Sequence, residues 1–114
     1  QLVGEDVLPN DQALVMEIAR IIKKAFLQQN ALHKEDTYTV PAKQYKMLKV
    51  IDTLYESALK CVKLGIPIST IKSQDIVQDV LRMKENIPND RPELLDELCG
   101  RIVQVYSELS LKYE

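Results

Sequence analysis

The chain has 114 residues, of which 46% are hydrophobic and 28% charged, with 15 basic side chains against 17 acidic ones. This length accommodates one small domain with its own core, and the composition is typical of a folded globular protein rather than a disordered or fibrous one. The charges of both signs alternate along the chain and no apolar run approaches the roughly 18 residues of a membrane span, so we expect no nucleic-acid partner and no direct membrane insertion.

Helical spacing of apolar residues runs along almost the whole chain, and no stretch alternates with period two for long enough to predict a strand. The first predicted helix starts near Asn10 or Asp11, either of which can cap it, and continues to about Asn30. Its apolar residues cover more than one stripe, which predicts burial on two sides and a central position in a small bundle.

Three more helices follow. Residues 31–40 form a loop before Pro41, and a second helix spans about 42–64 and stops at Gly65. Ser73 can cap a third, shorter helix that ends before Pro88, and a fourth begins at Pro92 and runs to the end of the chain. The sequence therefore predicts an all-α, four-helix bundle.

Residue types that carry chemistry are few. Cys61 and Cys99 have no Cys-x-x-Cys spacing and the chain has one His, so a zinc site is effectively excluded and no metal ligand is predicted. We interpret the two cysteines as buried free thiols, with a disulfide as the alternative. His33 lies beside carboxylates, as a general base can, but without a nearby nucleophile we interpret it as a surface or hydrogen-bonded histidine. No catalytic residue is predicted.

Two polar patterns each have two interpretations. Lys43, Lys46 and Lys49 form a basic stripe, which we interpret as a solvated, salt-bridged face rather than a phosphate-binding track. The amides from Gln28 to Asn30 can satisfy the last carbonyls of the first helix or contact a ligand. The chain has three scattered glycines and no glycine-rich phosphate loop, so it cannot cradle a triphosphate by that route.

Several phrases resemble the C-terminal region of archaeal and bacterial A/V-type ATP synthase A subunits. They are Phe26-Leu27-Gln28-Gln29-Asn30-Ala31, then His33, Asp36, Thr37 and Tyr38, and then Lys43-Gln44-Tyr45-Lys46-Met47-Leu48. The phrase Gln1-Leu2-Val3-Gly4 resembles the end of the lever helix in that family. Because the chain opens within this phrase and without an initiator Met, we expect a piece of a longer polypeptide.

The resemblance implies a parent subunit whose upstream nucleotide-binding domain hydrolyses or synthesises ATP with Mg²⁺, coupled to H⁺ or Na⁺ transport. The piece itself would hold no cofactor and would not be an enzyme alone. Its implied partners are that upstream domain, alternating B subunits in a hetero-hexameric ring, and the central rotor stalk. The implied location is cytoplasmic, on the inner face of the membrane.

The same resemblance assigns two sites within a single domain of residues 1–114. Residues 1–11 would be a rotor-facing lever turn, with contacts at Gly4, Glu5, Asp6 and Asp11, and residues 12–114 the bundle. The adenine-facing edge would comprise Gln29, Asn30, Ala31 and Leu32, although the family commonly has Phe where this chain has Leu32. The alternative function is a free-standing helical adaptor module that binds a partner helix.

Overall fold

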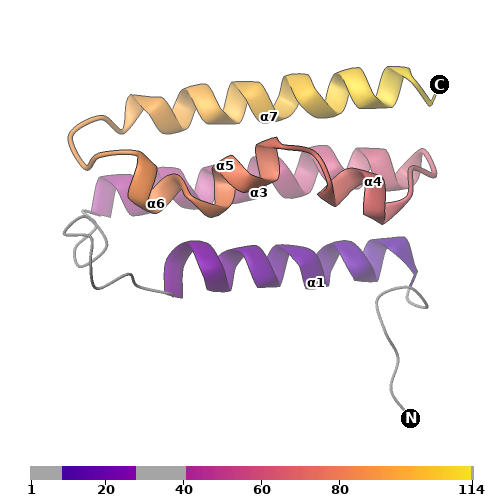
Figure 1. Cartoon of the computed structure of the whole chain (residues 1–114), viewed down its shortest axis with the longest axis horizontal. Coiled ribbons are helices and arrows are strands. Elements are labelled where there is room, and N and C mark those ends of the chain that lie inside the picture. Colours follow the sequence, from indigo (N-terminus) through magenta and orange to yellow (C-terminus); the bar gives the residue numbers. More distant parts are fainter. Residues whose placement is uncertain (1–8, 28–40, 114) are drawn as a thin grey trace, which may run out of the picture.

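The computed structural model describes residues 9–27 and 41–113, and these residues are predominantly helical (Figure 1). The elements in chain order are α1 (Asn10–Ile22), the π-helix η2 (Lys23–Leu27), α3 (Pro41–Lys63), α4 (Ile68–Lys72), α5 (Ile76–Leu81), α6 (Met83–Asn86) and α7 (Glu93–Leu111). The described residues contain no strand, so the predicted all-α class is confirmed.

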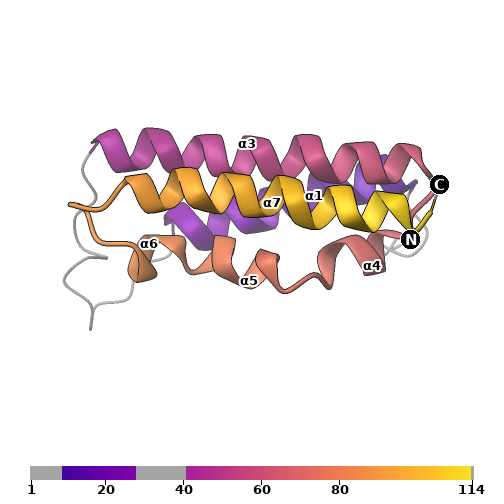
Figure 2. The ribbon, with the colours of Figure 1, turned by 90° about the horizontal axis from the view of Figure 1, so that it is seen from above.

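Three long helices, α1, α3 and α7, run alongside one another, and the short helices α4, α5 and α6 occupy the position of a fourth rod (Figures 1 and 2). Figure 2 shows α3 on one side and α4–α6 on the other, with α7 and α1 between them. Helix α3 packs most extensively against α7 and next most against α1. The core is aliphatic, with fully buried side chains that include Leu14, Ile21, Met47, Val50, Val80, Leu95, Leu98 and Ile102.

The predicted third helix differs from the structure. Ser73 does not start a helix, because its Oγ donates to the carbonyl of Thr70 at 3.0 Å and so closes the end of α4. The side-chain amide of Gln74 donates to the same carbonyl, also at 3.0 Å. A second break falls at Arg82, where φ is −105° and ψ is 5°, outside helical geometry. The residues predicted as one helix therefore fold as two short helices, α5 and α6, and α4 precedes them as a helix that was not predicted.

Helix α1 begins at Asn10, one residue earlier than a cap at Asn10 would place it and two earlier than a cap at Asp11 would. Pro9 occupies the capping position with extended geometry, and its carbonyl accepts the amide of Ala13 at 2.9 Å. The predicted cap is therefore wrong, although the predicted start is confirmed to within a residue. The predicted end near Asn30 lies outside the described residues.

The predicted central position of the first helix is also wrong. Helix α1 buries Ala13, Leu14 and Ile21, but Val15, Met16 and Ile22 remain 54%, 49% and 37% exposed. Helix α3 makes the most extensive contacts of the long helices instead, because it packs against both α7 and α1.

The end of α3 follows its sequence signal. Gly65 adopts a φ of +86°, which favours glycine, and its amide donates to the carbonyl of Val62 at 2.9 Å. The amide of Ile66 donates to the carbonyl of Cys61 at 3.1 Å, which completes a Schellman motif. The predicted stop at Gly65 is confirmed, and it turns the chain toward α4.

Candidate functional site

The two sites predicted from the resemblance lie mostly outside the described residues. Gly4, Glu5 and Asp6 of the rotor-facing set are outside them, as are His33 and the adenine-facing set Gln29, Asn30, Ala31 and Leu32. Asp11 is described: it is exposed in the first turn of α1, and its Oδ1 accepts the amide of Gln12 at 2.9 Å. A carboxylate here is stabilised by the helix dipole and is accessible to a cationic partner.

The structure describes the residues on both sides of the segment 28–40. On its N-terminal side, η2 packs against α5 and α6, and Ala25 is buried. The Nζ of Lys84 donates to the carbonyl of Phe26 at 3.4 Å, which satisfies one of the last carbonyls of η2. Short π-helical turns are frequent at functional sites, and this one ends at Leu27, two residues before Gln29 of the predicted adenine-facing edge.

On the C-terminal side of that segment, Lys43 is fully buried. Its Nζ donates to the carbonyl of Lys84 at 2.7 Å and also to the carbonyl of Ile87. A lysine ammonium is favoured at these carbonyls because they lie at the C-terminal, negative end of α6. We call Lys43, Lys84 and the carbonyls they bind the α6 clamp, because it connects α6 to the residues that flank 28–40 on both sides.

The α6 clamp corrects the interpretation of the basic stripe. Lys46 does form a salt bridge, 2.6 Å from Asp96, and the Nζ of Lys49 lies 5.6 Å from the centre of the Tyr45 ring. Lys43 does not belong to that solvated face. The sequence did contain a sign that Lys43 is buried. It shares one face of the helix with Met47, Val50 and Leu54, because residues three and four apart lie on the same side.

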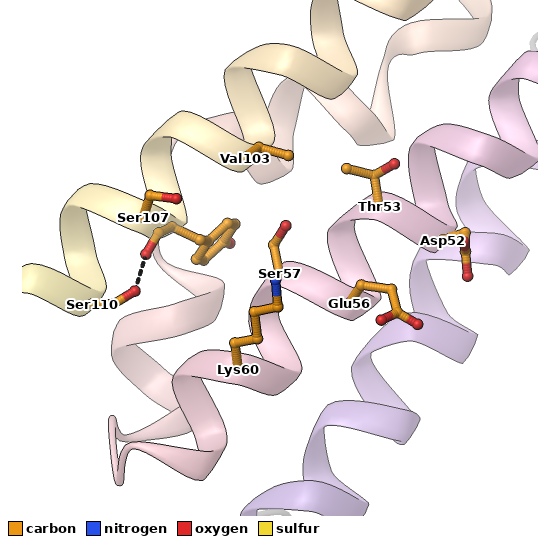
Figure 3. A pocket seen from close by; sticks show the side chains of 9 residues that line it. Asp52, Thr53, Glu56, Ser57, Lys60, Val103, Ser107 and Ser110 are labelled. Atoms are coloured by element: carbon orange, nitrogen blue, oxygen red, sulfur yellow. Dashed lines mark hydrogen bonds between the residues drawn. The ribbon is translucent and has the colours of Figure 1, made fainter.

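A groove of about 230 Å³ lies between α3 and α7 (Figure 3). It is lined by Asp52, Thr53, Glu56, Ser57, Lys60, Val103, Tyr106, Ser107 and Ser110. The hydroxyl of Thr53 donates to the carbonyl of Lys49 at 2.8 Å, and that of Ser110 donates to the carbonyl of Tyr106 at 2.6 Å. These hydroxyls therefore bond to the backbone of their own helices, as Ser and Thr within helices commonly do. None of the predicted site residues lies here.

Beneath this groove, the buried Tyr106 side chain connects α7 to α4. Its hydroxyl donates to the carbonyl of Ile71 at 2.8 Å. Burial raises the pKa of Tyr106, because the charged phenolate would lose its hydration. The pKa of the Cys61 thiol is raised for the same reason.

Both cysteines are free thiols, as predicted, but only Cys61 is fully buried and Cys99 is partly exposed. Within residues 9–27 and 41–113, no group of three or more His, Cys, Asp or Glu side chains could hold a metal ion. In the same part of the chain, no helix is both long and apolar enough to cross a membrane.

Comparison with known proteins identifies the class of this helical domain. A family model described as the C-terminal domain of V and A type ATP synthase matches residues 1–72. The V-type ATP synthase alpha chain 2 of Clostridium tetani is 53% identical over 113 residues, which cover 99% of this chain and 19% of that protein.

Two further relatives agree. The V-type ATP synthase alpha chain of Halothermothrix orenii is 48% identical over 114 residues, which cover 100% of this chain and 19% of that protein. The A subunit of the A-type ATP synthase of Methanopyrus kandleri is 44% identical over 110 residues, 96% of this chain and 18% of that protein. The chain thus spans about a fifth of the length of these relatives.

The chain belongs to the family of C-terminal domains of V- and A-type ATP synthases, because the family model covers well over half of it. The resemblance drawn from the sequence is therefore confirmed. The family model ends at residue 72, but the similarity to the relatives continues through α7.

Proposed function

We propose that this domain is the lever of the catalytic subunit of a rotary A/V-type ATP synthase. The identity of 53% over 113 residues to a V-type ATP synthase alpha chain carries this proposal. We propose that an upstream nucleotide-binding domain holds ATP or ADP with Mg²⁺. The helical domain would couple ATP hydrolysis or synthesis to rotation of a central shaft. B subunits and the rotor stalk would be its neighbours, at the cytoplasmic face of a membrane.

The packing of the long helices supports a mechanical role. Helix α3 packs against both α1 and α7, and the side chains between them are fully buried. Interiors packed in this way have low compressibility, so a displacement applied at one end of α1 reaches the other end with little loss. Closure of the nucleotide domain around ATP would swing the domain as a rigid body, and its tip would push the shaft.

The tip in this proposal is the turn 4–11, with Gly4, Glu5, Asp6 and Asp11 as rotor contacts. The position of Asp11 supports it, because this carboxylate is exposed at the N-terminal end of α1 and available to basic side chains on a shaft. The opposite end of the same helical stretch leads, through η2, to the proposed adenine-facing edge. One rigid element would therefore connect the nucleotide to the shaft.

The lever function is tested by replacing Glu5, Asp6 and Asp11 together with Ala in the assembled complex. We expect ion transport per ATP hydrolysed to fall while the KM for ATP stays unchanged, because the acidic tip contacts the rotor and not the nucleotide. Glu97→Ala is the matched control, since Glu97 is an exposed carboxylate on α7, which lies at the opposite side of the molecule from α1 (Figure 1). A variant that binds ATP poorly but couples normally would contradict the assignment.

The adenine-facing edge, Gln29 to Leu32, has a separate test. We expect Leu32→Phe to lower the KM for ATP by roughly fivefold, because an aromatic ring stacked on adenine adds about 1 kcal/mol over an aliphatic contact. The measurement is the KM for ATP in the assembled complex, with Leu48→Phe, an exposed site on α3, as control. An unchanged KM would remove Leu32 from the nucleotide site.

A further inference from the structure

One residue of the α6 clamp, Lys84, takes part in the contacts on both sides of residues 28–40. Its carbonyl accepts a hydrogen bond from the Nζ of Lys43 at 2.7 Å, and its own Nζ donates to the carbonyl of Phe26 at 3.4 Å. Phe26 precedes the segment in the sequence and Lys43 follows it. The chain on the two sides of this segment is therefore attached to the same short helix, α6.

Helix α6 is itself anchored in the core. Met83, its first residue, is fully buried, and Ile87, directly after its last residue, is 9% exposed. The helix also packs against α5 and η2. Because side chains in a close-packed interior resist displacement, α6 provides a fixed support for both points of attachment.

The chemistry of Lys43 indicates positioning rather than simple filling of space. Its side chain is 0% exposed, and an aliphatic side chain of similar length would avoid the cost of burying a charged group. The ammonium offsets that cost through its bonds to the carbonyls of Lys84 and Ile87. Hydrogen bonds are directional and apolar contacts are not, so these bonds specify where the start of α3 lies relative to α6.

We propose that the α6 clamp sets the base selectivity of the nucleotide site, with Lys84 and Lys43 as positioning residues for the adenine-facing edge. This inference rests on the proposed edge, Gln29 to Leu32, which lies between the two points of attachment in the sequence. Fixing both ends of a connecting segment reduces the number of conformations open to it. A site held in its binding-competent arrangement binds more tightly, because less ordering accompanies binding.

The place at which the clamp acts determines which ligands are affected. ATP and GTP carry the same triphosphate, but adenine has an amino donor where guanine has a carbonyl acceptor. The amide side chains of Gln29 and Asn30 are of the type that distinguishes such groups, because each amide carries both a donor and an acceptor. Loss of the clamp should therefore weaken the binding of ATP and leave that of GTP nearly unchanged.

Lys84→Met in the assembled complex tests the inference, because methionine keeps most of the length of the side chain but cannot donate to Phe26. We expect the KM for ATP to rise about fivefold, the loss of one hydrogen bond converted to affinity, while the KM for GTP and both kcat values stay near those of the wild type. Lys43→Met should lower the preference for ATP in the same direction. Because KM does not depend on the amount of active enzyme, a variant that assembles less well still reports this preference.

Arg82→Met is the matched control, because Arg82 is an exposed cation two residues before Lys84, and it should leave both KM values unchanged. A parallel rise of the KM for ATP and GTP, or a fall in kcat alone, would show that Lys84 only supports the fold and would overturn the proposal. Unchanged KM values in Lys84→Met would overturn it as well.

Leu32→Phe separates this inference from the edge on which it rests. If Leu32→Phe alters the KM for ATP and Lys84→Met does not, the adenine-facing edge is supported and the clamp does not position it. If neither variant alters the KM for ATP, the edge itself is misassigned, and the inference is overturned with it. Neither result bears on the lever, which is tested by torque and ion transport.

Discussion

The Tyr106 side chain makes a polar contact within the core. Its side chain is 2% exposed, and its hydroxyl donates to the carbonyl of Ile71 at 2.8 Å. The bond fixes the middle of α7 to α4, the short helix that follows the turn at Gly65. A buried carbonyl without a hydrogen-bond donor destabilises the folded state. The Tyr106 hydroxyl therefore stabilises the fold mainly by donating to the carbonyl of Ile71.

We therefore expect Tyr106→Phe to lower the free energy of unfolding by about 1–3 kcal/mol, since the ring still fills its place but Ile71 loses its donor. Urea denaturation of the chain, followed by circular dichroism, measures this loss. Tyr45→Phe is the matched control, because Tyr45 is 62% exposed and its hydroxyl is not needed in the core. Equal stability of the two variants would contradict the assigned role of Tyr106.

The buried side chains of Cys61 and Tyr106 predict that the fold loses stability at alkaline pH. Burial raises the pKa values of Cys61 and Tyr106 above their ordinary values of 9.0 and 10.0. Groups with a raised pKa in the folded state stabilise the fold fully below the ordinary pKa, and this contribution is lost as the pH rises toward the folded pKa. We expect the urea concentration at the midpoint of unfolding to decrease as the pH rises above about 9. In the Tyr106→Phe variant this decrease should be less steep than in the wild type.

At the scale of elements, the α6 clamp relates three parts of the chain that are distant in sequence. Lys43 of α3 donates to carbonyls at the end of α6, and Lys84 of α6 donates to the carbonyl of Phe26 in η2. The clamp therefore fixes the residues on both sides of 28–40, the segment that contains the proposed adenine-facing edge.

We expect Lys43→Met to destabilise the domain by about 1–3 kcal/mol, because methionine fills the space but leaves the two carbonyls without their donor. Lys49→Met serves as control: Lys49 is exposed, and such surface changes stay within about 0.5 kcal/mol. Thermal or urea unfolding compares the two variants. A larger loss for Lys49→Met than for Lys43→Met would show that the clamp contributes little to stability.

The elements also show what the sequence could and could not predict. The end of α3 was predictable from local sequence, because Gly65 and Pro67 are the residues that commonly follow a helix. The structure shows Gly65 at the positive φ that ends the helix. The same local signals misplaced the third helix. The side chains of Ser73 and Gln74 donate to the carbonyl of Thr70 at the end of α4, and no strong sequence pattern predicts a helix as short as α4.

The adenine-facing edge stays a prediction, and it rests on the resemblance and not on the chemistry of its residues. The amides Gln29 and Asn30 look like ordinary helix-ending residues, and only the family phrase gave them a role. The α6 clamp was missed because a lysine is rarely expected in a core. The double stripe on α1 was correctly recognised as apolar on two sides, but the chain alone covers only one of them.

At the scale of the molecule, the domain is a set of long helices around one core, with each end of α1 leading toward one proposed contact. The N-terminal end carries Asp11, and the C-terminal end continues through η2 toward residues 29–32. This arrangement suits the transmission of motion that we propose for the domain.

The torque that the assembled complex delivers to its shaft tests the lever most directly. Single-molecule rotation at saturating ATP would compare the wild type with the variant in which Glu5, Asp6 and Asp11 are replaced by Ala. We expect reduced torque with an unchanged KM for ATP. Undiminished torque, together with weakened ATP binding, would contradict it.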